Sequence, residues 1–149
     1  MTTPSGTDAL QTALAAEHAA VYVFGVLGAQ TSESQQPKLW GDLLAAFRQH
    51  PAARDQLVAR ITKAGAQPVA AAPSYELPNE VANPDQVVRA ALVTERRATQ
   101  TYGTLVSETL GGDRSWAIRA LDESAVRQLR FRGRPEIFPG TRGLEAQVR

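Results

Sequence analysis

Cysteine is absent from the 149-residue sequence, and this absence excludes several kinds of chemistry. Without thiols the chain can form no disulfide framework, no thiolate zinc site and no cysteine nucleophile. Any bound metal ion would therefore need Glu, Asp or His ligands. An excess of charge of one sign is also lacking, because 16 basic and 15 acidic residues give a net charge of +1. This balance favours neither a disordered tail nor a general polyanion binder.

Long hydrophobic runs are missing as well. The most apolar stretch, residues 13–29, is interrupted by Glu17 and His18, so we expect it to fall short of a membrane span. The first eight residues have no basic segment ahead of an apolar run and do not resemble a secretory signal. These two features lead us to expect a cytoplasmic protein with no membrane-spanning part.

Strand-like alternation of apolar and polar residues is not found, and neither is a phosphate-binding loop, a Ser-His-Asp arrangement or a zinc-protease motif. Apolar residues instead recur at steps of three and four, which is typical of helices that bury one face. The pattern predicts helices over residues 8–30, 38–64, 84–110 and 113–133, followed by an irregular tail at 134–149. We therefore expect an all-α four-helix bundle formed by one domain.

Proline and glycine mark the expected helix ends. Pro37 suits the first turn of the second helix, and Gly65 suits its end. The run Asn83-Pro84-Asp85 combines a side-chain cap, a proline and an acid at the start of the third helix. Pro51 lies inside the second helix, where it removes a hydrogen bond. At Pro51 we expect a kink or a fresh helix start.

The connection at residues 66–83 contains three prolines, shows no periodicity and is long for a link between bundle helices. A bundle whose second and third helices run in the same direction needs one long crossover of this kind. The loop therefore indicates this topology.

Two glutamates occupy the predicted apolar faces. Glu17 lies in the middle of the inner face of the first predicted helix. Glu95 lies in the middle of the inner face of the third predicted helix. On the second helix, His50 and Arg54 continue the apolar stripe. An isolated buried carboxylate costs several kcal/mol, so both glutamates need a partner.

These residues resemble the ferritin-like superfamily. The segment 15–22, AAEHAAVY, resembles the opening helix of such proteins, and Glu95 followed two turns later by Tyr102 is similar to their third helix. The chain is also similar to a small bacterial ferritin-like family of unknown function. This likeness is carried by the Ala-Glu-His run with the following Tyr22, His50 with Arg54-Asp55, the proline-rich crossover and the Phe138-Pro-Gly140 tail. The resemblance implies a bundle with one crossover and brings no established activity.

The metal-site pattern of that superfamily is incomplete here. A dimetal bundle uses one glutamate from each of two helices and a Glu-x-x-His pair from each of the others. Phe47 stands three residues before His50, and the fourth predicted helix has no histidine. The site is therefore expected to be degenerate.

Two interpretations of the core follow. In the first, Glu17, His50 and Glu95, with His18 or Asp122, bind one Fe, Mn or Zn ion in an oxidoreductase or metal-handling protein.

In the second interpretation, Arg54 supplies the missing cation to Glu17 and Glu95, and His50 is a hydrogen-bond partner. The protein is then a metal-free, non-enzymatic structural or interaction module without a cofactor. We favour this second interpretation.

Partners are suggested by two surface features. Alanines that allow close helix approach predict a homodimer; they are Ala15, Ala16, Ala19 and Ala20. A weaker alternative is nucleic-acid binding through arginines that surround Phe131 and Phe138, although acidic neighbours dilute their charge. These arginines are Arg127, Arg130, Arg132, Arg134 and Arg142.

Overall fold

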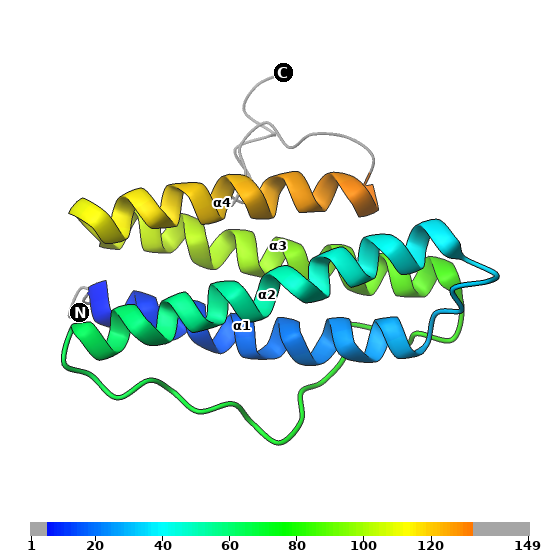
Figure 1. Ribbon diagram of the computed structural model, residues 1–149, viewed down its shortest axis with the longest axis horizontal. Helices are drawn as coiled ribbons and strands as arrows, with labels where there is room; N and C mark the ends of the chain where they lie inside the picture. Colours follow the sequence, from blue (N-terminus) through cyan, green and yellow to red (C-terminus); the bar gives the residue numbers. More distant parts are fainter. Residues whose placement is uncertain (1–5, 133–149) are drawn as a thin grey trace.

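The computed structural model describes residues 6–132, which form an all-α four-helix bundle (Figure 1). No strand occurs within residues 6–132, so the expected fold class is confirmed. Each helix begins and ends within two residues of the range expected from the sequence. The expected irregular tail at 134–149 lies outside the described residues. The helices are α1 (Gly6–Ala29), α2 (Pro37–Lys63), α3 (Pro84–Glu108) and α4 (Gly111–Arg132).

The four helices form two antiparallel pairs that lie against each other. α1 packs on α2, α3 packs on α4, and α1 joins the two pairs by packing on α3. The chain between α2 and α3 returns along the whole bundle, so α2 and α3 run in the same direction (Figure 1). This single long crossover, the kind that ferritin-like bundles use, confirms the expected topology.

The crossover is held against α1 by side chains of that helix. Gln11 donates to the carbonyl oxygen of Gln67 at 2.7 Å and accepts from the backbone N–H of Val69 at 2.8 Å. The ring Nε2 of His18 lies 3.0 Å from the carbonyl oxygen of Val69. The first half of the long connection is therefore anchored to α1 by polar contacts.

The helix ends follow the sequence signals. The side chain of Asn83 accepts a hydrogen bond from the backbone N–H of Gln86 at 3.0 Å, which caps α3. Gly65 adopts a φ of 80°, and the N–H groups of Gly65 and Ala66 bond to the last carbonyls of α2. A left-handed residue with this pair of bonds is a common helix C-terminus, and it favours glycine.

α2 is continuous through Pro51, so the fresh helix start considered at that position is absent. Proline leaves the carbonyl oxygen of Phe47 without its helical partner. The side chain of Phe47 is 36% exposed, which places this turn at the surface, where water can reach a freed carbonyl group. Surface exposure thus makes the proline tolerable. The apolar stripe of α2 predicts Phe47 on the inner face together with Leu43 and Leu57, and for Phe47 this prediction is wrong.

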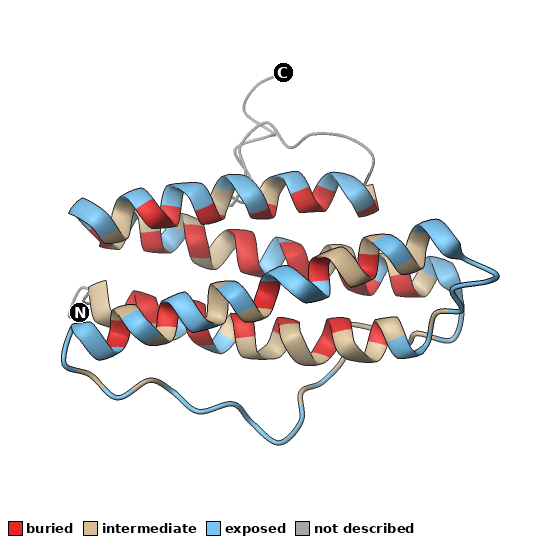
Figure 2. Cartoon of the chain, in the orientation of Figure 1, coloured by how far each residue is buried: buried red, intermediate tan, exposed pale blue. Residues whose placement is uncertain are grey.

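The core consists of two apolar clusters separated along the bundle axis by a polar layer. Buried residues line the facing sides of the helices (Figure 2). One cluster lies toward the start of α1, and its largest members are Leu10, Leu14, Leu57, Ile61, Tyr102, Leu105 and Trp116. The other lies toward the end of α1, and its largest members are Val23, Phe24, Leu27, Leu43 and Phe131.

On α4 the apolar residues at steps of three and four predict an inner face formed by Ile118, Leu121, Ala125 and Leu129, and the observed inner face differs from it. Ile118 and Leu129 are 44% and 36% exposed, whereas Ser124, Arg127 and Gln128 are buried. Hydropathy misplaces this face because α4 directs polar side chains into the bundle at its centre.

α1 is long and apolar enough to cross a membrane when only its length and composition are considered, contrary to expectation. In the described part of the chain it is the one helix that meets this criterion. Buried core helices of bundles can meet it too, and α1 buries Leu10, Leu14, Glu17 and Phe24 against α2 and α3.

Candidate functional site

The polar layer contains a connected set of ionisable side chains to which every helix contributes. Glu17 comes from α1, His50 from α2, Glu95 and Tyr102 from α3, and Arg127 from α4. All five are at most 6% exposed. We call these five residues the ionic cluster.

His50 is the centre of the ionic cluster. Its Nδ1 atom lies 2.6 Å from a carboxylate oxygen of Glu17, and its Nε2 atom lies 3.1 Å from Oε1 of Glu95. Phe24 stacks on the imidazole ring with a centroid distance of 5.0 Å. A neutral imidazole has a single N–H and can donate to only one carboxylate, so with both glutamates ionised this geometry favours the doubly protonated cation.

Glu95 receives a second cation from α4. Nε of Arg127 lies 3.0 and 3.1 Å from the two carboxylate oxygens, and Nη1 of the same guanidinium donates to Gln49 at 3.2 Å. The hydroxyl of Ser124 lies 3.4 Å from Oε2 of Glu95. Glu95 is fully buried, and it is paired with cations from two different helices.

Glu17 is paired with a phenol on its other side. The hydroxyl of Tyr102 donates a short hydrogen bond to Oε1 of Glu17. Burial and the negative charge of Glu17 raise the pKa of Tyr102 well above its ordinary value, so the phenol stays protonated and remains a donor.

The pKa shifts of His50 and Glu95 are consistent with a cationic imidazole and an anionic carboxylate. Burial alone lowers the pKa of His50, but the charge of Glu17 and the hydrogen bonds to Glu17 and Glu95 outweigh burial and raise it to about 9. Burial raises the pKa of Glu95, but the His50 hydrogen bond and the Arg127 charge outweigh it and lower the net value. With His50 and Arg127 as cations and Glu17 and Glu95 as anions, the buried charges cancel.

A second set of polar contacts joins α3 to α4 beside the ionic cluster. The hydroxyls of Thr99 and Ser124 lie 2.6 Å apart, and Gln128 donates to Thr99 at 2.7 Å. Thr99 also donates to the carbonyl oxygen of Glu95. These bonds hold α4 in the register that places Arg127 on Glu95.

The structure brings together Glu17, His50 and Glu95, three residues that the sequence placed in the core. Arg54, the expected cation, is not among them. Its guanidinium pairs with the neighbouring Asp55 at 2.8 Å, and its side chain is 32% exposed. The prediction for Arg54 is therefore wrong, because it lies away from the glutamates and an adjacent acid satisfies its charge.

The two auxiliary metal ligands considered in the sequence also lie elsewhere. His18 contacts the crossover backbone at Val69, and Asp122 is exposed on α4. Within residues 6–132, no group of three or more His, Asp and Glu side chains is arranged to hold a metal ion.

The donor set does not fit a dimetal centre. On α4, Ser124 and Arg127 have the i, i+3 spacing of a Glu-x-x-His pair, but they supply a hydroxyl and a guanidinium. A guanidinium has no lone pair with which to bind a metal ion. Both ring nitrogens of His50 already contact carboxylates. These side chains therefore do not supply the two Glu-x-x-His pairs that a dimetal centre needs.

Arg127 and Tyr102 are the members of the ionic cluster whose roles the sequence did not reveal. Arg127 was grouped with surface arginines, and Tyr102 was noted only for the resemblance to the third helix of ferritin-like proteins. The i, i+3 spacing from Ser124 to Arg127 is a signal that could have identified the guanidinium. Recognising it requires the correct helical phase of α4, which hydropathy does not give.

Several residues of the arginine strip considered for nucleic-acid binding are buried or paired with an acid. Arg127 is buried on Glu95, Phe131 is 8% exposed, and Arg130 lies 3.5 Å from Asp42. Arg134, Arg142 and Phe138 lie outside the described residues. The described arginines therefore do not form one exposed strip.

Comparison with known proteins places the chain in a family. A family described as "Domain of unknown function (DUF4439)" matches residues 9–143, which is most of the sequence. The chain belongs to this family. A crystal structure of a conserved hypothetical protein, rv2844, from Mycobacterium tuberculosis is similar to this DUF4439 chain. Its TM-score is 0.80 at 29% identity, over 88% of this chain and 97% of that chain. No curated protein matches the sequence.

The geometry of this DUF4439 chain predicts different roles for its two candidate arginines. Arg127→Met should lower the free energy of unfolding by about 3–5 kcal/mol, because it leaves buried Glu95 with one cation fewer. Arg54→Met should cost less than about 1 kcal/mol, since it breaks an exposed ion pair. Urea unfolding of the two variants measures both values. Equal losses, or a larger loss for Arg54→Met, would contradict this assignment.

The pKa shifts predict a pH dependence of stability. The pKa of His50 is raised from 6.5 to about 9, so its stabilisation is fully present below about pH 6.5 and is lost as the pH rises toward 9. The pKa of Glu95 is lowered from 4.5, so its stabilisation is present above about pH 4.5 and is lost at lower pH. Together these two groups should contribute most between about pH 4.5 and 6.5.

Urea unfolding from below about pH 4.5 to above about pH 9 measures the effect. The alkaline loss attributable to His50 should be on the order of 3 kcal/mol. His50→Gln should lack it, because glutamine does not titrate. An unchanged alkaline slope in His50→Gln would show that other groups cause the loss.

Proposed function

We propose that this protein is a metal-free, non-enzymatic bundle of the ferritin-like type that acts by binding rather than by catalysis. In this proposal the ionic cluster takes the place of a dimetal centre. The observation that carries it is the position of His50, whose two ring nitrogens face the two glutamates that would otherwise be metal ligands. Two protein cations supply the positive charge that metal ions would provide.

The saturation of the carboxylates supports a non-catalytic role. A general acid or base needs a group that can exchange a proton with substrate. Glu17 is engaged by His50 and Tyr102, and Glu95 is engaged by His50 and Arg127. Neither carboxylate is more than 1% exposed. The ionic cluster is thus suited to fixing the four helices in register.

Homodimer formation and a cytoplasmic location are further parts of this proposal. Ala20 is buried in the core, so it is not available to a partner, whereas Ala15 is exposed. A shallow apolar groove of about 290 Å³ between α1 and α2 is lined by Phe24, Trp40 and Phe47. A groove of this composition is compatible with a protein contact.

Elemental analysis tests the metal-free proposal. Protein prepared without chelator should contain no stoichiometric Fe, Mn or Zn, and adding each ion should leave the melting temperature unchanged, because a ligand that binds the folded state raises it.

Two matched variants make the outcome interpretable. The proposal is contradicted if the protein contains one metal ion per chain, and if this ion is lost in Glu95→Gln but kept in Asp122→Asn. That result would favour the metal-binding alternative. Asp122 is the appropriate control because it is an exposed acid on α4.

A further inference from the structure

The α2 and α4 helices enclose a cleft that the ionic cluster does not fill. Its volume is about 420 Å³, within the range of small-molecule sites. α2 and α4 make few contacts with each other, and small residues line the middle of the opening between them. These residues are Ala52, Ala53 and Ala120.

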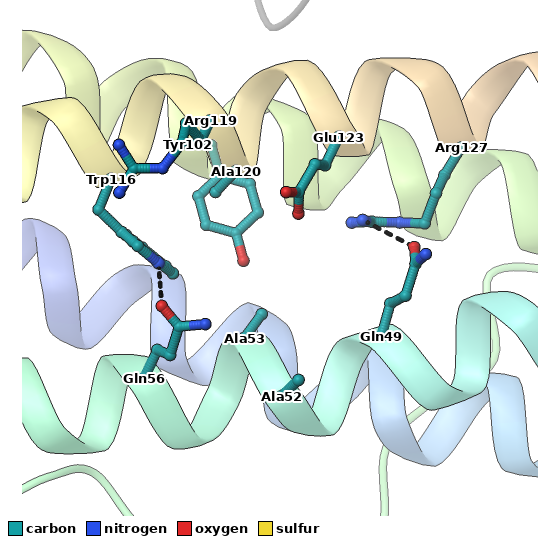
Figure 3. A pocket seen from close by; sticks show the side chains of 10 residues that line it. All are labelled: Gln49, Ala52, Ala53, Gln56, Tyr102, Trp116, Arg119, Ala120, Glu123 and Arg127. Carbon is teal, nitrogen blue, oxygen red and sulfur yellow. Dashed lines mark hydrogen bonds between the residues drawn. The ribbon is translucent and has the colours of Figure 1, made fainter.

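Polar bridges span the cleft at both ends, and Figure 3 shows them. At one end Arg127 donates to Gln49 at 3.2 Å. At the other end the indole N–H of Trp116 donates to Gln56. The bridges hold the two helices at a fixed separation, so the opening is a built feature of the bundle.

Arg127 presents a preorganised donor to this cleft. Its Nε atom binds Glu95, its Nη1 atom binds Gln49, and its Nη2 atom has no hydrogen-bond partner among the described residues. The guanidinium end of the side chain points along the cleft (Figure 3). A planar guanidinium held at two nitrogens is well suited to bind an oxyanion through its remaining N–H groups.

Glu123 adds a charge of opposite sign. It lies one turn before Arg127 on α4, and its carboxylate points into the cleft (Figure 3). It forms no ion pair with another side chain of residues 6–132. A simple cation would be repelled by Arg127 and by Arg119 at the other end, and a simple anion would be repelled by Glu123.

We propose that this cleft binds a small zwitterion with a carboxylate, an ammonium group and an apolar body, such as an amino acid with a large apolar side chain. The carboxylate contacts Arg127, the ammonium group contacts Glu123, and the apolar body packs on the alanines beside Tyr102 and Trp116. This inference deepens the binding role proposed above. It rests on that proposal in one respect, namely that Glu95 holds Arg127 in place.

Three probes of similar size separate the contributions. L-Phenylalanine carries both charged groups, hydrocinnamate lacks the ammonium group, and phenethylamine lacks the carboxylate. The indole N–H of Trp116 lies in the cleft wall and reports binding by NMR, while that of Trp40, in a different groove, is the internal control. Millimolar L-phenylalanine should shift the Trp116 signal and leave that of Trp40 in place. The other two probes should bind at least about tenfold more weakly, because each loses one charged hydrogen bond.

Variants locate the site without disturbing the ionic cluster. Glu123→Gln should weaken L-phenylalanine binding at least about tenfold, while Asp122→Asn, next to it and outside the cleft, should not. Ala53→Leu should block the cleft, while Ala59→Leu, on the same helix but outside it, should not. Circular dichroism establishes that each variant is folded.

The inference is overturned if L-phenylalanine fails to shift the Trp116 signal, if hydrocinnamate or phenethylamine binds as tightly, or if the control variants lose binding equally. Its failure is distinguishable from failure of the proposed function. If the protein is metal-free and does not bind L-phenylalanine, only the assignment of the cleft is wrong. If it contains stoichiometric metal, the proposed role of the ionic cluster is wrong.

Discussion

Two carboxylates buried in a helical core are unfavourable unless cations reach both of them. Here one imidazole reaches both, because His50 lies between Glu17 and Glu95 with a ring nitrogen toward each. Arg127 supplies the second cation and neutralises the set. Since these four charges come from four helices, each helix must keep one rotation and one height relative to the others. The charge balance therefore constrains the arrangement of the whole bundle.

The features around the ionic cluster follow from this constraint. Apolar clusters lie on both sides of it and exclude water, which strengthens each charged hydrogen bond. At its centre α4 is positioned by Arg127 and by the Thr99 and Ser124 contacts, while Trp116 and Phe131 bury apolar surface nearer its two ends. Its polar contacts to α2 include one at each end of the cleft, Arg127 with Gln49 and Trp116 with Gln56, so the cleft stays open between these two contacts. The same guanidinium that balances the core thereby becomes part of the cleft wall.

Helical periodicity and helix-end residues predicted the four helices and the crossover because both signals are local. Periodicity also placed Glu17, His50 and Glu95 inside, since apolar neighbours one turn away define the inner face. It failed on α4, where the buried side is polar at Ser124, Arg127 and Gln128, so hydropathy selected Ile118 and Leu129 instead. Arg54 was misassigned because spacing along α2 cannot show that Asp55 takes its guanidinium. Pairings between distant segments depend on the packed structure.

The protonation of His50 tests the central claim most directly. In ¹⁵N-labelled protein at about pH 7, NMR should show protons on both ring nitrogens, with loss of one of them centred near the raised pKa of about 9. A His18→Gln variant assigns the signals, because the chain has only two histidines. A His50 ring that is neutral at about pH 7, or that titrates near its ordinary pKa of 6.5, would contradict the account.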